Sequence, residues 1–365
     1  MSRQLLYKPT SVFVSNGEVF LCDSGNHRVR KLLRNGQIVS ICGTGIRGYN
    51  GDDRPATEAQ LDGPNSVVVS SSNQVYISEA KRIRKIDQNG IISTIAGTGM
   101  GTFNGDGQLA VNANVSHVEG LFVTEEEEIL FADCGNRRVR KIDRYGIVST
   151  IAGTGEDGFA GDGQLAVHAK LSYPSSVFMY KKELYIADTR NHRVRKIDRH
   201  GIISTIAGNG KQDYNGDNLM ATRTSLNPKC VCVHNDQVYM TDKCNDRIRK
   251  ILSNGMVKII AGKGVNICYT SHAIDSCLNL PEGMFIDERG QIYFADTDNH
   301  CIRKIDQNEI ISVIVGMGRK GYAGDVSFDF QRYPHVGPKK RPLIEFTTQL
   351  ADITIYCFDS NFSHK

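Results

Sequence analysis

Short runs of apolar residues separated by polar turns recur along the whole chain. In the stretch 174–208 the runs are Ser176–Met179, Leu184–Asp188, Arg193–Asp198 and Ile202–Gly208. The third run alternates charged and apolar residues, which predicts a strand with one face in water. A glycine closes the polar turn between the third and fourth runs, as a hairpin requires. The pattern predicts four short antiparallel strands.

The same stretch returns six times at a spacing of 54 to 56 residues. Its most constant phrase is Asn191-His192-Arg193-Val194-Arg195. The branched aliphatic residue at the centre of each copy is Val29, Ile83, Val139, Val194, Ile248 or Ile302. Six units of four strands predict an all-β fold, a six-bladed β-propeller with four-stranded antiparallel blades, over residues 8–318. Each blade takes its strands from one contiguous stretch, so no strand exchange is expected to close the ring.

The linkers between units carry small residues at helical spacing. After the third unit they read Phe159-Ala-Gly-Asp-Gly163, then Ala166, Ala169 and Leu171. This spacing predicts one short helical turn that packs against the neighbouring unit. Because a repeat unit cannot bury its apolar faces alone, contacts between blades are expected to be the main stabilising term, at about 25 cal/mol per Å² of apolar area.

The phrase, the acidic residue before it and the Gly-Asp linker together resemble the NHL repeat family of six-bladed propellers. The resemblance covers about residues 8–325. Three departures stand out: Glu79 replaces the aspartate of the second unit, Cys301 replaces the arginine of the sixth, and the linker 262–280 lacks Gly-Asp.

Composition narrows the class of protein. Of 365 residues, 40% are hydrophobic and 23% charged, with a net charge of +4, so wholesale disorder is excluded and the basic excess is small. No apolar run approaches the ~18 residues of a membrane helix, and the first residues do not resemble a signal peptide. Ten cysteines at irregular positions indicate reduced thiols rather than a disulfide framework. We therefore expect a cytoplasmic protein with no membrane partner.

Residues repeated in every blade are expected to serve architecture. The aspartate that ends the second strand and the arginine that begins the third predict a charge-assisted hydrogen bond that fixes the turn between them. These structural residues are Asp23, Arg28, Asp133, Arg138, Asp188, Arg193, Asp242, Arg247 and Asp296. The linker aspartates are interpreted as turn residues; they are Asp52, Asp106, Asp162, Asp217 and Asp325.

Recognition is expected where the repeat varies. The second position of the first strand should lie around one mouth of the central channel, and its residue type varies among the blades, with glutamate in two of them. These candidate partner-binding residues are Thr10, Asn65, Glu119, Ser175, Lys229 and Glu282. The loops between the second and third strands open on the same side and also vary, and loops on a rigid scaffold often carry binding residues. The leading hypothesis is a non-catalytic scaffold that binds a protein or peptide; the alternative that these are only solvated loop residues stays open.

The sequence leaves two other classes of function open, RNA binding and catalysis. Some NHL propellers bind single-stranded RNA on a positive face, but this sequence offers no obvious exposed aromatic residues among the cations. Related propellers include a lyase and lactonases, yet the histidines here lack metal-ligand spacing. Glu119 and Glu282 belong to opposite blades, which predicts a separation too large for shared coordination. No catalytic residue, metal or cofactor is predicted.

The C-terminal part departs from the repeat. Residues 319–345 hold prolines and a basic triplet, which predicts an extended or disordered linker. Within 346–365, six residues resemble the opening of a BTB/POZ domain; they are Asp352, Ile353, Ile355, Phe362, His364 and Lys365. The resemblance implies a truncated domain, and, if a complete one followed, a substrate adaptor for a cullin-type ubiquitin ligase. A disordered tail with one apolar run is the open alternative.

Overall fold

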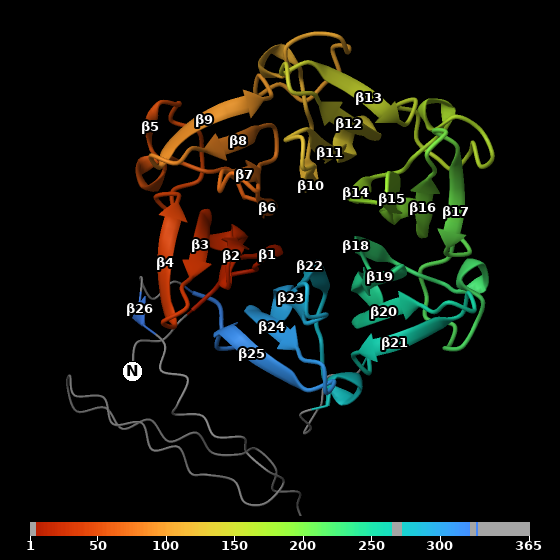
Figure 1. The fold of residues 1–365 in the computed structure, drawn as a ribbon. Coiled ribbons are helices and arrows are strands. Elements are labelled where there is room, and N and C mark those ends of the chain that lie inside the picture. Colours follow the sequence, from red (N-terminus) through yellow and green to blue (C-terminus); the bar gives the residue numbers. More distant parts are fainter. Residues whose placement is uncertain (1–4, 265–271, 322–325, 328–365) are drawn as a thin grey trace, which may run out of the picture. The chain divides into compact units, whose positions relative to one another are not determined.

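Six sheets arranged around a central axis form the body of the protein (Figure 1). The computed structural model describes residues 5–264, 272–321 and 326–327. One compact unit spans Met1–Phe328, and Asp329–Lys365 form a second. The prediction for the tail 346–365, including its BTB/POZ resemblance, lies outside the described residues.

Each blade is a four-stranded antiparallel sheet built from consecutive strands. The first three blades comprise β1 (Ser11–Ser15), β2 (Glu18–Asp23), β3 (Arg28–Leu32) and β4 (Gln37–Cys42); β6 (Ser66–Val69), β7 (Val75–Ser78), β8 (Ile83–Ile86) and β9 (Ile91–Ala96); and β10 (Val118–Val123), β11 (Ile129–Asp133), β12 (Arg138–Ile142) and β13 (Val148–Ala152). The last three comprise β14 (Pro174–Tyr180), β15 (Glu183–Asp188), β16 (Arg193–Ile197) and β17 (Ile203–Ala207); β18 (Pro228–His234), β19 (Gln237–Asp242), β20 (Arg247–Ile251) and β21 (Val257–Ala261); and β22 (Pro281–Ile286), β23 (Ile292–Asp296), β24 (Cys301–Ile305) and β25 (Ile311–Gly316). The predicted six-bladed propeller is confirmed, with β1, β6, β10, β14, β18 and β22 innermost (Figure 1).

The hairpin between β16 and β17 shows why the sequence forms this unit. Gly201 has a φ of +79°, which a residue with a side chain rarely adopts. The Asp198 carboxylate accepts the backbone N–H groups of His200 and Ile202, each at 2.9 Å. Local hydrogen bonds and the glycine backbone thus fix the turn that joins the two strands.

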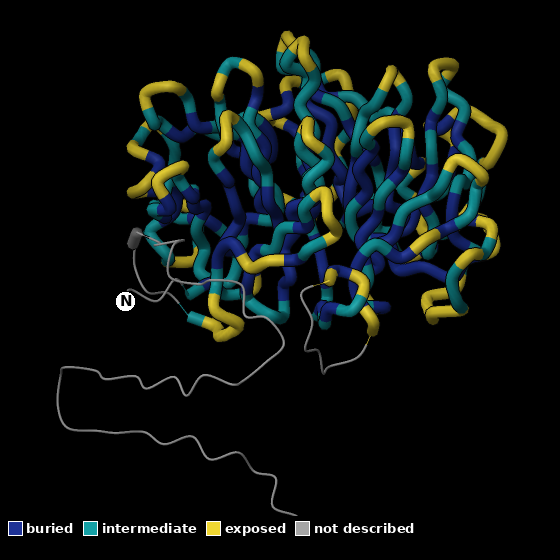
Figure 2. The backbone as a smooth tube through the Cα atoms, turned by 60° about the horizontal axis from the view of Figure 1, so that its bottom comes forward, coloured by how far each residue is buried: buried dark blue, intermediate teal, exposed yellow. Residues whose placement is uncertain are grey.

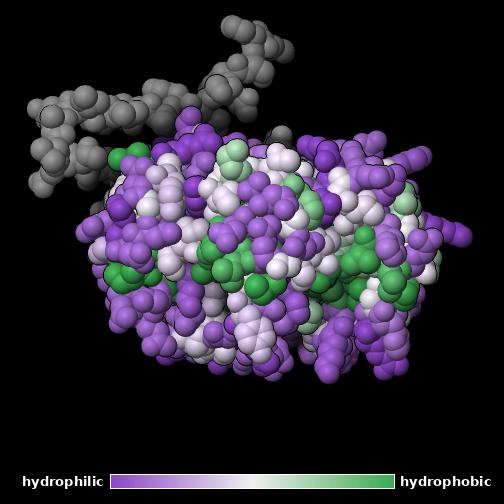
Figure 3. All heavy atoms as spheres, turned by 90° about the horizontal axis from the view of Figure 1, so that it is seen from above, coloured by the Kyte–Doolittle hydropathy of each residue, from purple (hydrophilic) through white to green (hydrophobic). Residues whose placement is uncertain are grey.

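The apolar core lies between the blades (Figure 2). One cluster joins Leu130 of β11 to Ile186 of β15 through the linker residues Ala169 and Leu171, all four fully buried. The predicted helical turns are present as single 3₁₀ turns, each opening on a buried alanine: η2 (Ala56–Glu58), η3 (Ala110–Asn112), η5 (Ala166–His168), η7 (Ala221–Arg223) and η9 (Ala273–Asp275). Seen from the side, the propeller is mostly polar with apolar patches between the polar regions (Figure 3).

The two ends of the propeller chain meet at the seam between the last blade and the first. The backbone of β26 (Val326–Ser327) pairs with β4, as β5 (Arg54–Pro55) pairs with β9 in the second blade. The backbone N–H of Gly321 also donates to the Leu6 carbonyl at 3.1 Å. The compact unit that holds the blades thus extends past residue 318, the boundary expected from the sequence, because the segment after β25 adds to the first blade. As predicted, the four main strands of each blade come from one stretch.

Candidate functional site

Every blade contains a buried ion pair between its second and third strands. In the fourth blade Arg195 Nη1 lies 3.3 Å from Asp188 Oδ2, and both side chains are completely buried. The equivalent pairs are Asp23–Arg30, Glu79–Arg84, Asp133–Arg140, Asp242–Arg249 and Asp296–Arg303. Burial raises the pKa of Asp188 to about 6, although Asn191, the Ser172 N–H and Arg195 lower it. These side chains hold the blade together.

The aspartate pairs with a different arginine from the one predicted. Asp188 lies opposite Arg193 in the strand register, but its carboxylate contacts the diagonal neighbour Arg195. The arginine that begins the third strand binds backbone carbonyls instead: Arg28 donates to Gly43 at 2.6 Å and to Thr44 at 2.5 Å. Arg138, Arg193 and Arg247 donate likewise to carbonyls beside their own strands. The architectural role is present, but it differs from the one predicted.

The linker aspartates also pair with the buried arginines. Arg140 Nη2 lies 2.9 Å from Asp106, and Arg195 Nη2 lies 2.7 Å from Asp162. Asp52 and Asp217 contact the arginines of their blades in the same way. Each of these four linkers is therefore held to the blade that follows it, which goes beyond the turn role expected; Asp325 lies outside the described residues.

The six candidate residues at the second position of the first strand all line one cavity on the central axis. Its volume is about 270 Å³. The structure thus brings together the residues that the sequence placed around one mouth: Thr10, Asn65, Glu119, Ser175, Lys229 and Glu282. Their role in binding a partner stays a prediction.

The uncharged members of this set are already engaged in bonds between blades. Thr10 Oγ1 donates to the Asn65 carbonyl at 2.9 Å, and Asn65 Nδ2 donates to the Val118 carbonyl at 3.0 Å. Ser175 Oγ donates to the Lys229 carbonyl at 2.7 Å. Each side chain reaches the first-strand segment of the next blade, so these three residues tie the ring together.

The charged members form one network across the channel. Lys229 Nζ lies 2.6 Å from Glu119 Oε2 and 3.9 Å from Glu282 Oε2, and Lys243 Nζ lies 2.5 Å from Glu282 Oε1. Burial lowers the pKa of Lys229, but the two carboxylates outweigh it and raise that pKa overall. The Lys229 side chain thus reaches carboxylates of two other blades, while the expectation that Glu119 and Glu282 lie too far apart to coordinate one metal ion stays a prediction.

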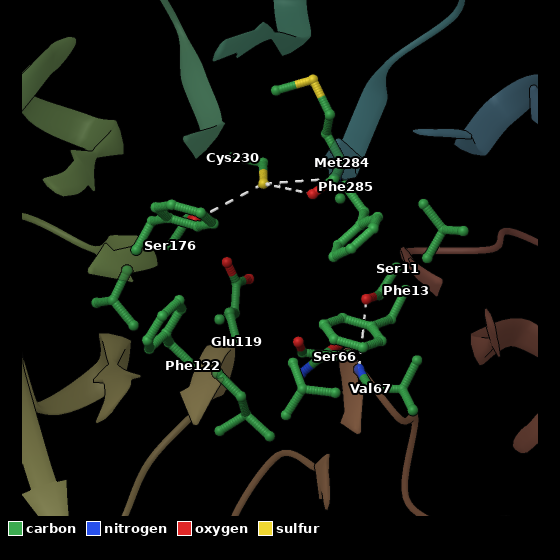
Figure 4. Close-up of a pocket in the computed structure, with 18 of the residues that line it drawn as sticks. Ser11, Phe13, Ser66, Val67, Glu119, Phe122, Ser176, Cys230, Met284 and Phe285 are labelled. Atoms are coloured by element: carbon green, nitrogen blue, oxygen red, sulfur yellow. Dashed lines mark hydrogen bonds between the residues drawn. The ribbon is translucent and has the colours of Figure 1, made fainter. Parts of the chain in front are cut away.

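Below this network the channel wall is aromatic. The rings of Phe13 and Phe285 lie 4.6 Å apart between centroids, and those of Phe122 and Phe178 lie 5.2 Å apart. Figure 4 shows Phe13, Phe122 and Phe285 around the open centre, with Glu119 at the same cavity. The cavity therefore joins a charged mouth to an apolar interior.

Exposed aromatic residues do accompany the cations, contrary to the sequence analysis. Tyr49, Phe159 and Tyr214 are 38–41% exposed. The guanidinium group of Arg193 lies 3.7 Å from the centroid of the Phe159 ring, and Arg82 and Arg247 stack likewise on Tyr49 and Tyr214. The aromatic residues lie in the linkers, where the sequence pattern gave no sign that a ring would meet an arginine.

The cysteines differ from the expectation in one respect. Cys277 is disulfide-bonded. The free thiols of the described residues belong to Cys22, Cys42, Cys134, Cys230, Cys232, Cys244 and Cys301. Within the same described ranges, no three histidine, cysteine or acidic side chains are placed to hold a metal ion, and no helix is long and apolar enough to cross a membrane.

Comparisons with known proteins agree with the repeat. A family profile described as NHL repeat matches residues 6–32, and one described as Teneurin NHL domain matches residues 36–104. Human teneurin-4 (Homo sapiens) is 30% identical over 280 residues, which cover 66% of this chain and 10% of teneurin-4. NHL repeat-containing protein 2 of Gallus gallus is 25% identical over 344 residues, covering 82% of this chain and 46% of that protein. This chain therefore spans a tenth to about half of the length of these relatives.

Solved structures agree on the fold. A streptogramin B lyase aligns with a TM-score of 0.52 over 87% of this chain and 85% of that chain, at 14% identity. At so low an identity the likeness concerns the arrangement of blades alone. Together, the profile matches, the six repeated phrases and the six blades show that this chain is a β-propeller of the NHL-repeat family.

Proposed function

We propose that the propeller is a non-catalytic scaffold that binds a protein or peptide partner through its turn face. We define the turn face as the side that carries the turns between second and third strands: η1 (Ser24–Asn26), residues 79–82, η4 (Cys134–Asn136), η6 (Thr189–Asn191), η8 (Lys243–Asn245) and η10 (Thr297–Asn299). The teneurin and NHL repeat-containing relatives support a scaffold rather than an enzyme.

One observation selects the residues of the proposed binding surface. The residues at the channel mouth are occupied by contacts within the ring, whereas exposed side chains of the turn face differ from blade to blade; they include Lys81, His117, Arg190 and Cys244. Loops held by a rigid sheet can vary without cost to the core. We therefore place recognition on the turns, around the mouth rather than in it.

Reversing the charge of two turn residues is expected to abolish partner capture. The variant Lys81→Glu/Arg190→Glu alters two exposed positions in the second and fourth blades, so we expect the fold to persist and capture to fall roughly tenfold or more, the loss of a hot-spot contact. The measurement is quantitative mass spectrometry of proteins retained by the immobilised chain.

The control carries the same charge change on the opposite side. Lys182→Glu/Arg199→Glu alters exposed residues in the turns of the fourth blade that face away from the turn face. It should retain every protein that the wild type captures. Equal retention by both double variants would exclude the turns of the second and fourth blades as the binding surface.

Single-stranded RNA is a second candidate, favoured by the half-exposed rings stacked on arginines. If it binds there, log K should fall by about 0.7 per unit of log salt concentration for each phosphate contacted. Tyr214→Leu should weaken binding by about 1–3 kcal/mol, the contribution of one stacked base. Tyr145→Leu, a change of an exposed ring beside Arg144, should leave affinity unchanged. Fluorescence anisotropy with an oligonucleotide tests this, and a flat salt response argues against it.

Two finer assignments stay predictions. A role as adaptor for a cullin-type ubiquitin ligase depends on the tail 346–365, which lies outside the described residues. A cytoplasmic location is supported by the seven free thiols, while the disulfide at Cys277 argues against it.

A further inference from the structure

The innermost strand of the fifth blade departs from the others at two positions. Elsewhere the third position of this strand is serine or glycine and the fifth is phenylalanine or valine. The pairs are Ser11/Phe13, Ser66/Val68, Gly120/Phe122, Ser176/Phe178 and Gly283/Phe285. In β18 they are Cys230 and Cys232. Two thiols thus lie on one face of β18 in the wall of the cavity. The other five blades form the same strand with different residues at these positions, so the fold does not require cysteine there.

Both sulfur atoms converge on the next blade. Cys232 Sγ donates to the Met284 carbonyl at 3.1 Å, and Cys230 Sγ lies 3.7 Å from the same oxygen. The Met284 N–H donates to Cys230 Sγ at 3.4 Å, and the Ser176 hydroxyl donates to it at 3.7 Å (Figure 4). A sulfur that receives hydrogen bonds from two neighbouring blades is favoured as a thiolate.

The surrounding charges act in the same direction. The neighbouring Cys232 thiol lowers the pKa of Cys230 against the opposing effect of burial, and the Met284 N–H, the Ser176 hydroxyl and Lys229 lower it further. The other charged groups of the channel, Glu119 and Glu282, are neutralised by Lys229 and Lys243. These contacts favour the thiolate form of Cys230.

Access separates Cys230 from the other free thiols. It is partly exposed on the cavity, whereas Cys22, Cys42, Cys134 and Cys301 are buried. Cys244 is exposed, but burial of its sulfur raises its pKa. The cavity of about 270 Å³ is slightly smaller than the ~300–1,000 Å³ of sites for drug-sized ligands, and its walls are apolar and aromatic. It fits only a small, largely apolar molecule.

We propose that Cys230 is a covalent modification site for small apolar electrophiles of the α,β-unsaturated carbonyl class, with Cys232 as its positioning residue. The thiolate attacks the β-carbon and forms a carbon–sulfur bond. The π electrons of the broken C=C bond move to the α-carbon, which takes a proton from water. No oxidant or reductant is needed, and the thioether remains in the channel.

N-ethylmaleimide is the probe for this site. The folded chain is treated with it near pH 7, digested, and the adduct located by tandem mass spectrometry, because Cys230 and Cys232 share one peptide. Among the free thiols of the described residues, we expect modification at Cys230 and at Cys244. A maleimide carrying a long polyethylene glycol chain should modify Cys244 and leave Cys230 free, since only the small reagent enters the channel.

The pH dependence tests the role of Cys232. In the wild type the rate at Cys230 should rise with a midpoint below that of an ordinary thiol. Cys232→Ala should move that midpoint upward because Cys230 loses the neighbour that most lowers its pKa, whereas Cys301→Ala, which removes a buried thiol of another blade, should leave it unchanged. The site is disproved if Cys230 stays unmodified in the folded chain, or if it reacts with the midpoint of an ordinary thiol.

Discussion

Arg195→Met is expected to lower the free energy of unfolding by about 3–5 kcal/mol, the cost of breaking a buried ion pair by removing one partner. Asp188 is completely buried and would keep only its bonds to Asn191 and to the Ser172 N–H. Asp162 would lose the same arginine, so the linker before the fourth blade would also be released. Urea unfolding at pH 7.5 measures the loss.

The sign of the pH dependence gives an independent check. Without the arginine the pKa of Asp188 rises further above its unfolded value, because burial still raises it while one of the groups that lower it is gone. The folded variant consequently binds a proton more tightly than the unfolded chain does. Its deficit relative to the wild type should shrink as the pH falls from 7.5 towards 5.

Two further variants distinguish the effect of losing the ion pair from nonspecific destabilisation of the fold. Arg195→Met/Asp188→Asn removes both charges and should be more stable at pH 7.5 than Arg195→Met alone. Lys181→Met breaks the exposed pair between Lys181 and Asp236 and should cost about 0–1 kcal/mol. If Arg195→Met costs no more than Lys181→Met, the buried pair is not what holds the blade.

The number of blades and their strand boundaries could be predicted because one period controls both. A strand of alternating residues, a glycine turn and a branched aliphatic residue recur together, and six copies leave few other architectures. Positions facing the neighbouring blade, such as Ala169 and Leu171, were found for the same reason. The local pattern of strands and turns and the packing between blades favour the same fold.

The partner of the buried aspartate could not be predicted from strand alternation alone. Arg193 and Arg195 lie on the same face of β16, so alternation cannot tell which one meets Asp188. The direct and diagonal cross-strand neighbours are both within reach of so long a side chain. A signal was present within the repeat: the position of Arg195 is arginine in all six blades, whereas that of Arg193 is Cys301 in the sixth. A residue present in every unit is the better candidate for a buried pair.

The channel mouth could be located but not interpreted. The ring of varied residues does line the cavity, yet sequence alone does not show that the Lys229 side chain reaches Glu119 two blades away. Nor does it show that the side chains of Thr10 and Asn65 donate hydrogen bonds to backbone carbonyls of the next blade. Both facts depend on how far apart the innermost strands stand, a distance set by the closed ring as a whole.

Leu171→Ala is expected to cost about 2–5 kcal/mol, the range for truncating a fully buried leucine. Leu171 lies in the cluster that joins the third and fourth blades, so the cavity would open at an interface between repeats. Leu165→Ala is the matched control: it makes the same chemical change in the same linker, but Leu165 is 47% exposed, and we expect a loss within about 0.5 kcal/mol.

The shape of the unfolding curve tests the closed ring itself. Opening one interface leaves two apolar faces in water, which should weaken every neighbouring contact in turn. We therefore expect Leu171→Ala to move a single urea transition to lower concentration without splitting it. A separate early transition confined to the third and fourth blades would show that the blades unfold independently, and that the interfaces rather than ring closure set the stability of each one.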